Sequence, residues 1–100
     1  MTKELEKSLE VLRAQMPYLK EAYHVREIGV FGSFVHGDFT EKSDIDILVD
    51  FDEGAKIGFI KFIGLEEYLS ERLQRKIDLV TKDALKPIIK DKILNDAVYV

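Results

Sequence analysis

The strongest constraint on the fold is segment 44–51, Asp-Ile-Asp-Ile-Leu-Val-Asp-Phe, in which apolar and acidic residues alternate. Successive side chains of a β-strand point to opposite faces, so this pattern predicts a strand. The expected apolar face carries Ile45, Ile47, Val49 and Phe51, and the opposite face carries Asp44, Asp46, Leu48 and Asp50. We therefore expect a sheet with one apolar face for the core and one mostly acidic face.

Two further strands are predicted from short apolar runs. Residues 28–32 form an apolar segment bounded by glycine. Residues 76–81 alternate again, with Ile77 and Leu79 on one face and Asp78 on the other. If the strands at 44–51 and 76–81 are neighbours, their aspartates project from the same face of the sheet.

Apolar residues at helical spacing predict three helices. The first covers the N-terminal residues up to Met16, and Pro17 is expected to end or kink it. The second spans residues 57–73, and its aromatic residues and leucines, from Phe59 to Leu73, are expected in the core. The third begins at Pro87 and runs to about residue 96, and an apolar tail, 97–100, follows it.

This order of elements predicts the fold class α+β (α/β-like), a small mixed sheet with helices covering one face. The 100 residues fit a single domain, 1–100, with one modest core. The absence of cysteine excludes a disulfide framework, a cysteine-ligated zinc site and a cysteine nucleophile.

Charge and hydropathy restrict the partners. The net charge is −4, whereas a nucleic-acid-binding protein needs a basic surface to neutralise phosphates, so we expect no nucleic-acid partner. No apolar run reaches the roughly 20 residues that span a bilayer, and the N-terminus lacks the apolar core of a signal peptide. We expect a cytoplasmic protein that does not insert into a membrane and that has apolar surface, around the tail at 98–100, for a protein partner.

Asp44, Asp46 and Asp78 are candidate metal ligands. Residues i and i+2 of a strand lie about 6.5–7 Å apart. That spacing suits one divalent ion, or a pair of ions about 3.5–4 Å apart. Oxygen-only ligands favour Mg²⁺ or Mn²⁺. The alternative is that the three acids are simply solvated on an exposed face, and spacing alone does not decide between these interpretations.

Gly32 and Ser33 are candidate phosphate-binding residues, because they end one strand and precede the acidic one. A glycine lets a phosphate approach the backbone, and a serine hydroxyl with the N–H groups of a helix start can hold it. The alternative is an ordinary strand-to-helix connection with Ser33 as the helix N-cap.

In combination, these residues resemble the nucleotidyltransferase superfamily typified by DNA polymerase beta. The shared pattern is Gly32-Ser33, ten residues, Asp44-x-Asp46 and a later strand with Asp78. Segment 32–49 is similar to the minimal nucleotidyltransferases, single-domain proteins known as MntA-type antitoxins. The resemblance covers about residues 28–100 and implies the palm-like fold of polymerase beta.

The resemblance also implies an activity, the transfer of AMP from ATP, a nucleoside triphosphate, to a hydroxyl, with Mg²⁺ or Mn²⁺ as cofactor. By this resemblance, Gly32, Ser33 and their loop hold phosphates, and Asp44 and Asp46 bind the metal pair. Asp78 completes one metal site and helps to deprotonate the acceptor. This chain has His36 where many members have an arginine, a difference that bears on nucleotide affinity.

The implied partner is a helical HEPN-domain toxin, bound in a hetero-oligomer and neutralised by AMPylation of a tyrosine, by direct binding, or by both. Two alternatives remain open from the sequence. One is a non-catalytic antitoxin that neutralises only by binding. The other is a small-molecule nucleotidyltransferase of the aminoglycoside-modifying kind, which would need a second domain or subunit to form its acceptor pocket.

Overall fold

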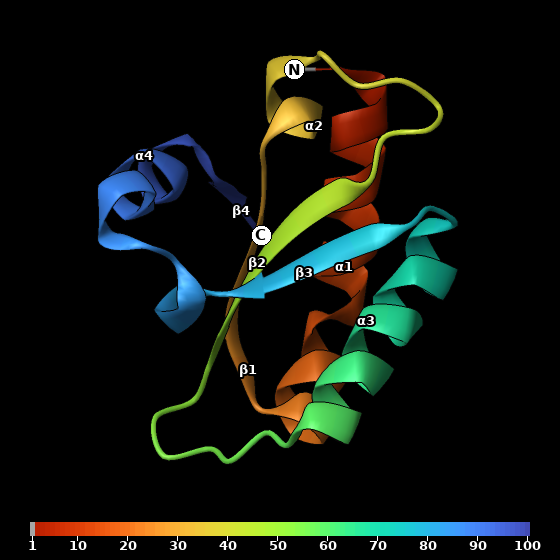
Figure 1. Ribbon diagram of the computed structural model, residues 1–100. Coiled ribbons are helices and arrows are strands. Elements are labelled where there is room, and N and C mark those ends of the chain that lie inside the picture. The colour runs from red at the N-terminus through yellow and green to blue at the C-terminus, as the bar shows by residue number, and fades with distance from the viewer. Residues whose placement is uncertain (1) are drawn as a thin grey trace.

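The predicted strands and helices are present in the predicted order in the computed structural model, which describes residues 2–100 and adds the short elements α2, η1 and β4 (Figure 1). The elements are α1 (Lys3–Tyr23), β1 (Val25–Phe31), α2 (Ser33–His36), β2 (Ile45–Phe51), α3 (Phe59–Leu73), β3 (Ile77–Thr81), the 3₁₀ turn η1 (Lys82–Ala84), α4 (Pro87–Asp96) and β4 (Val98–Tyr99). No helix within these residues has the length and apolar character that a membrane span needs.

The four strands form one mixed sheet in the order β3-β2-β1-β4. β1 pairs antiparallel with β2 and with β4, whereas β2 and β3 are parallel and are joined through α3. At the β3 edge, the N–H of Leu79 donates to Oε2 of Glu66 on α3 at 3.0 Å, which satisfies a backbone group without a further strand. The expected α+β class with a small mixed sheet is confirmed.

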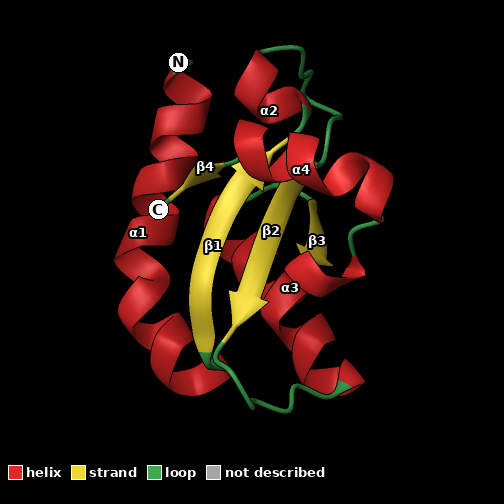
Figure 2. Cartoon of the chain, turned by 90° about the vertical axis from the view of Figure 1, so that its left-hand side faces the viewer, coloured by secondary structure: helices red, strands yellow, loops and turns green. Residues whose placement is uncertain are grey.

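The core lies between one face of the sheet and the helices α1 and α3. The helices contribute Leu5, Leu9, Leu12, Leu19, Leu65 and Leu69, and the strands contribute Val25, Ile28, Val30, Ile45, Ile47, Val49, Ile77 and Leu79. Figure 2 looks onto the other face, where α4 crosses one end of β1 and β2. The strand residues that alternate with the core residues therefore project away from α1 and α3, as the pattern at 44–51 predicts.

The prediction that Pro17 ends or kinks the first helix is wrong as to the end, because α1 continues to Tyr23. Proline removes one backbone donor and costs about 3 kcal/mol or more inside a helix. Continuing the helix fully buries Leu19 and packs Tyr23 against the core. Fully burying one leucine is worth about 1.5–3 kcal/mol, so these two residues together offset the proline.

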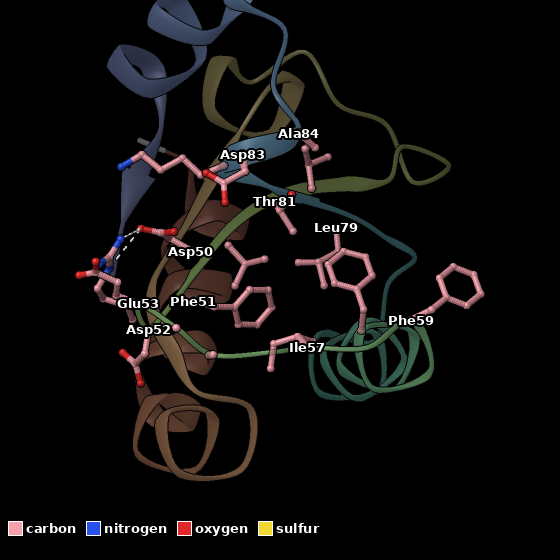
Figure 3. A pocket seen from close by; sticks show the side chains of 17 residues that line it. Asp50, Phe51, Asp52, Glu53, Ile57, Phe59, Leu79, Thr81, Asp83 and Ala84 are labelled. Carbon is pink, nitrogen blue, oxygen red and sulfur yellow. Dashed lines mark hydrogen bonds and ion pairs between the residues drawn. The ribbon is translucent and has the colours of Figure 1, made fainter.

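The expectation that all aromatic residues of segment 57–73 are buried is wrong for Phe59, which is 77% exposed. Phe59 is the first residue of α3, which begins two residues later than expected, and the fully buried positions of this helix are Leu65 and Leu69. Figure 3 shows the Phe59 ring directed away from the strands. An amphipathic stripe buries its side chains only where the helix lies against the sheet.

The apolar tail is also corrected, because it does not remain as free surface. Val98 and Tyr99 form β4 against β1, and the N–H of Val100 donates to the carbonyl of Ile28 at 3.1 Å. The Tyr99 ring lies against Gly29, where a Cβ atom would come within 2.9 Å of it. The tail thus covers the open edge of β1 and is half-buried, so exposed apolar surface for a partner must lie elsewhere.

Candidate active site

Parallel pairing of β2 with β3 places Asp46 beside Asp78. The two aspartates are direct partners in the strand register, and Phe31 at the end of β1 is the partner of Asp46 on the other side. Neighbouring strands lie about 4.8 Å apart, and residues opposite one another project from the same face. Asp44 comes just before β2, two residues from Asp46. The predicted acids therefore come together at one end of the sheet.

The three carboxylates are close enough to affect one another. The pKa of Asp46 is raised, first by burial and then by the negative charges of Asp78 and Asp44. Asp46 and Asp44 are half-buried and Asp78 is exposed. Partial burial and like charges both disfavour the ionised form of Asp46, and a bound cation would reverse this effect.

Gly32 brings the predicted phosphate-binding turn into contact with this acidic cluster. Its backbone, at φ +76° and ψ −149°, lies in a region that is essentially restricted to glycine. A Cβ atom at Gly32 would collide with Oδ2 of Asp46. The carboxylate of Asp46 thus rests directly on the backbone of the turn, in space that any other residue at position 32 would occupy.

The alternative interpretation of Ser33 as the helix N-cap is wrong, because Gly32 is the N-cap of α2 and Ser33 is its first helical residue. The chain leaves β1 through a backbone conformation that glycine adopts and serine does not. The Gly32 carbonyl accepts from the N–H groups of Val35 and His36 at 3.1 and 3.3 Å. The N–H groups that open a helical turn have no acceptor within the helix, so those of Ser33 and Phe34, with the Ser33 hydroxyl, are donors that could serve an anion.

The donor set fits a hard divalent cation. Carboxylate oxygens are the ligands that Mg²⁺ and Mn²⁺ prefer, and Asp44, Asp46 and Asp78 supply them from one region. Within residues 2–100, however, no three His, Asp or Glu side chains are gathered closely enough to hold a metal ion as they stand. Coordination by all three aspartates therefore requires their side chains to rotate.

His36 is a surface side chain. Its side chain is 54% exposed, and its Nε2 lies 3.6 Å from Oδ2 of Asp96 at the end of α4. This contact places α4 beside α2, at the end of the sheet where Asp46 lies.

A cavity of about 940 Å³ lies away from the acidic cluster, at the far ends of β2 and β3 (Figure 3). It is lined by the end of β2, the loop before α3, the start of α3 and η1. Asp50 in its wall is paired with Arg26 at 2.5 Å. Asp46 and Asp50 are separated by about 13 Å along the strand. None of Asp44, Asp46 and Asp78 is among the residues that line this cavity.

Arg75 is a residue near the site that the sequence analysis missed. It precedes β3, and its Nη1 donates to the carbonyls of Thr40 and Ser43 in the loop between α2 and β2. The only signal in the sequence is a basic residue before the strand of Asp78. Such a residue looks like an ordinary surface cation until the fold places it on a loop more than thirty residues earlier.

Comparison with known proteins agrees with this geometry. Residues 12–100 match the family model of the nucleotidyltransferase domain. The protein adenylyltransferase MntA of Thermococcus cleftensis is 49% identical over 96 residues, which cover 96% of this chain and 95% of that protein.

Two solved structures show the same fold. One described as a minimal nucleotidyltransferase superposes with a TM-score of 0.71 at 31% identity, over 90% of this chain and 93% of the other. A tri-AMPylated Shewanella oneidensis HEPN toxin in complex with an MNT antitoxin gives a TM-score of 0.58 at 21% identity, over 96% and 67% of the two chains. The second likeness concerns the fold alone.

Fold, site and relatives lead to the same conclusion. The structure brings the acids of β2 and β3 together and places the turn at Gly32 against Asp46. The family model covers most of the chain, and the Thermococcus relative matches over nearly its whole length. The chain belongs to the nucleotidyltransferase domain family and is a nucleotidyltransferase enzyme, a homologue of the MntA-type protein adenylyltransferases.

Proposed function

We propose that this protein transfers AMP from ATP to a hydroxyl group, a tyrosine, of a HEPN-domain toxin and thereby acts as its antitoxin. The observation that carries the proposal is the position of Asp46, whose carboxylate rests on the backbone of Gly32 while Asp78 stands beside it on β3. A phosphate-binding turn and a pair of acids in contact are what nucleotidyl transfer requires, since it depends on positioning and charge neutralisation.

Different residues of the chain bind the nucleotide and accept the proton. The hydroxyl of Ser33 and the first N–H groups of α2 hold the phosphates of ATP, and Gly32 leaves room for the carboxylate of Asp46. The acceptor oxygen forms a bond to the α-phosphorus, and the bond from that phosphorus to the β-phosphate bridging oxygen breaks, which releases pyrophosphate. Asp78, which is exposed, accepts the proton that the acceptor hydroxyl loses.

Asp44, Asp46 and Asp78 would hold the Mg²⁺ or Mn²⁺ of this reaction. When bound, the metal neutralises charge on the phosphates and lowers the pKa of the acceptor hydroxyl. The raised pKa of Asp46 supports this assignment, because its carboxylate is kept near other negative charges that a cation would balance.

We favour a macromolecular acceptor over a small molecule. The cavity of about 940 Å³ is not lined by any of the three aspartates, so it does not provide an acceptor pocket at the acids. Exposed apolar side chains, Phe59, Ile60 and Ile88, offer contact surface for a protein. The net charge of −4 favours a protein over a nucleic acid.

The test combines the protein with a HEPN-domain toxin, the product of a neighbouring gene where one is found, together with ATP and Mg²⁺ or Mn²⁺. We expect intact-mass spectrometry to show the toxin gaining one or more AMP groups, on a tyrosine. Asp46→Asn should abolish the gain. Asp52→Asn, the same chemical change at an exposed acid, should leave it intact.

Other outcomes point to the alternatives. A toxin that is neutralised in the complex without gaining AMP under either metal would identify a non-catalytic antitoxin. Consumption of ATP with a small hydroxylated acceptor, and none with the toxin, would identify a small-molecule nucleotidyltransferase.

A further inference from the structure

We propose that Arg75 is a positioning residue that holds loop 37–44, the connection between α2 and β2, in the shape that places Ser33 and Asp44. This inference deepens the proposed function, because the roles of Ser33 and Asp44 in catalysis rest on that proposal. The contacts that Arg75 makes belong to the fold and do not depend on the proposed function.

Arg75 makes three kinds of contact, which together we call the Arg75 clamp. The first is a set of hydrogen bonds to the backbone of loop 37–44. Nη1 of Arg75 donates to the carbonyl oxygens of Thr40 at 2.9 Å and Ser43 at 3.0 Å, with the carbonyl of Glu41 at 3.4 Å. Ser43 is the residue directly before Asp44. A charged donor on neutral carbonyls makes a stronger hydrogen bond than a neutral donor, so these contacts fix the end of the loop that carries the first acid.

The second part is stacking on the residues that follow the phosphate-binding turn. The guanidinium carbon of Arg75 lies 5.0 Å from the ring centre of Phe34 and 5.8 Å from that of Phe39. The two rings are themselves stacked, 4.1 Å apart. The distances from the guanidinium carbon to the two ring centres are both within the range of a cation–π interaction. Phe34 is buried and follows Ser33, so the same cation also contacts α2, which leads into the loop.

The third part is the anchoring of Arg75 itself. Its N–H donates to the carbonyl of Ser70 at 3.3 Å, and the Ser70 hydroxyl donates to its carbonyl at 2.8 Å. Next to it, the carbonyl of Lys76 accepts from the N–H of Ile45 at 2.9 Å. Arg75 thus stands on the end of α3, three residues before Asp78. One side chain joins the segments that carry Ser33, Asp44 and Asp78.

The shape of arginine matters for this role. A planar guanidinium can stack on aromatic rings and donate in its own plane at the same time, whereas the ammonium of lysine is a compact point charge. Within the loop, the N–H of Ser43 donates to the Thr40 carbonyl at 3.0 Å and the N–H of Thr40 to Oγ of Ser43 at 2.9 Å. The start of the loop is tied to α2 by the N–H of Asp38, which donates to the Ser33 carbonyl at 3.1 Å. Without Arg75, residues 40–43 would lose their hydrogen bonds to the segment that leads into β3.

The test uses hydrogen exchange, read by mass spectrometry, on the free full-length protein without nucleotide or metal. In Arg75→Ala we expect faster exchange confined to segment 37–44, with the core strands protected as in the wild type. Arg75→Lys should fall between the two. Arg72→Ala is the matched control, because Arg72 is near the same end of α3 but its cation lies over Tyr68, 4.8 Å from the ring centre; it should change nothing in the loop.

The kinetic readout separates positioning from folding. Transfer by Arg75→Ala should lose about 100-fold in kcat with a smaller change in the KM for ATP, the loss expected when reacting groups are misplaced by about 1 Å. Unchanged exchange in segment 37–44, or faster exchange spread evenly over the whole sheet, would overturn the clamp. Faster exchange in the loop with unchanged kcat would overturn its role in positioning. If the wild type transfers no AMP, the proposed function fails while the exchange result still decides whether Arg75 orders the loop.

Discussion

The two faces of the sheet are built from alternate residues of the same strands, yet one face packs the core and the other carries the acidic cluster. Ile45 and Ile47 of β2 are buried beneath α1 and α3, whereas Asp46 between them faces away, beside Asp78. The first face stabilises the fold by removing apolar surface from water. The second face holds carboxylates together, and this disfavours the ionised form of Asp46, whose pKa is raised by burial and by the neighbouring negative charges. One face therefore stabilises the fold, and the other carries the residues proposed for chemistry.

The largest expected effect is on the covered face. Leu69 of α3 is fully buried, so Leu69→Ala should lower the free energy of unfolding by about 2–5 kcal/mol. Ile60→Ala on the same helix, at a side chain 86% exposed, should stay within about 0.5 kcal/mol of the wild type. Chemical denaturation of both variants checks this. Equal losses at the two positions would show that the helix does not bury one face as described.

An intermediate effect is expected at Gly32, which lies between β1 and α2 and contacts Asp46. Gly32→Ala should lose about 1–3 kcal/mol from backbone strain, and its Cβ should also displace Asp46 and impair AMP transfer. Gly54→Ala is the matched control, since Gly54 also has a positive φ, +81°, but nothing lies within 4 Å of its added Cβ. Denaturation and transfer assays should show both variants destabilised and only Gly32→Ala inactive. An active Gly32→Ala variant would contradict the contact with Asp46.

The smallest effect is a pH dependence on the acidic face. Because the folded-state pKa of Asp46 is raised, the folded protein holds this proton more tightly than the unfolded chain does. Its contribution to stability is therefore present below the unfolded pKa and is lost as the pH rises through the raised folded value. The stability of Asp46→Asn relative to the wild type should accordingly increase as the pH rises across this range. Denaturation at several pH values tests the sign, and a difference that shrinks with rising pH would contradict it.

Most of the fold could be predicted because it depends on local periodicity. Alternation at 44–51 and 76–81 predicted two strands and their apolar faces, and leucine spacing predicted the helices that cover them. Pro17 misled because a local rule was outweighed by the burial of Leu19, which depends on the sheet. β4 was missed for the same reason, since two residues become a strand only when the edge of β1 is there to pair with.

The residues of the candidate site were predicted in part. Asp44, Asp46 and Asp78 could be grouped before the fold was known, because alternation assigns each strand residue to a face. The contact between Gly32 and Asp46 could not, since it depends on an unusual backbone conformation at one residue. Arg75 had no local signal at all, because its partners lie in a distant loop.

The central claim is that Asp46 serves chemistry and not the stability of the fold, and Asp46→Asn tests it most directly. The substitution keeps the shape of the side chain and removes its charge. Unfolding curves should be recorded in EDTA and in Mg²⁺ for the wild type and the variant, alongside AMP transfer. We predict that the metal-free variant is as stable as the wild type or more stable, that Mg²⁺ stabilises only the wild type, and that transfer is lost. A metal-free variant destabilised as strongly as Leu69→Ala would contradict the account, because Asp46 would then be a structural residue.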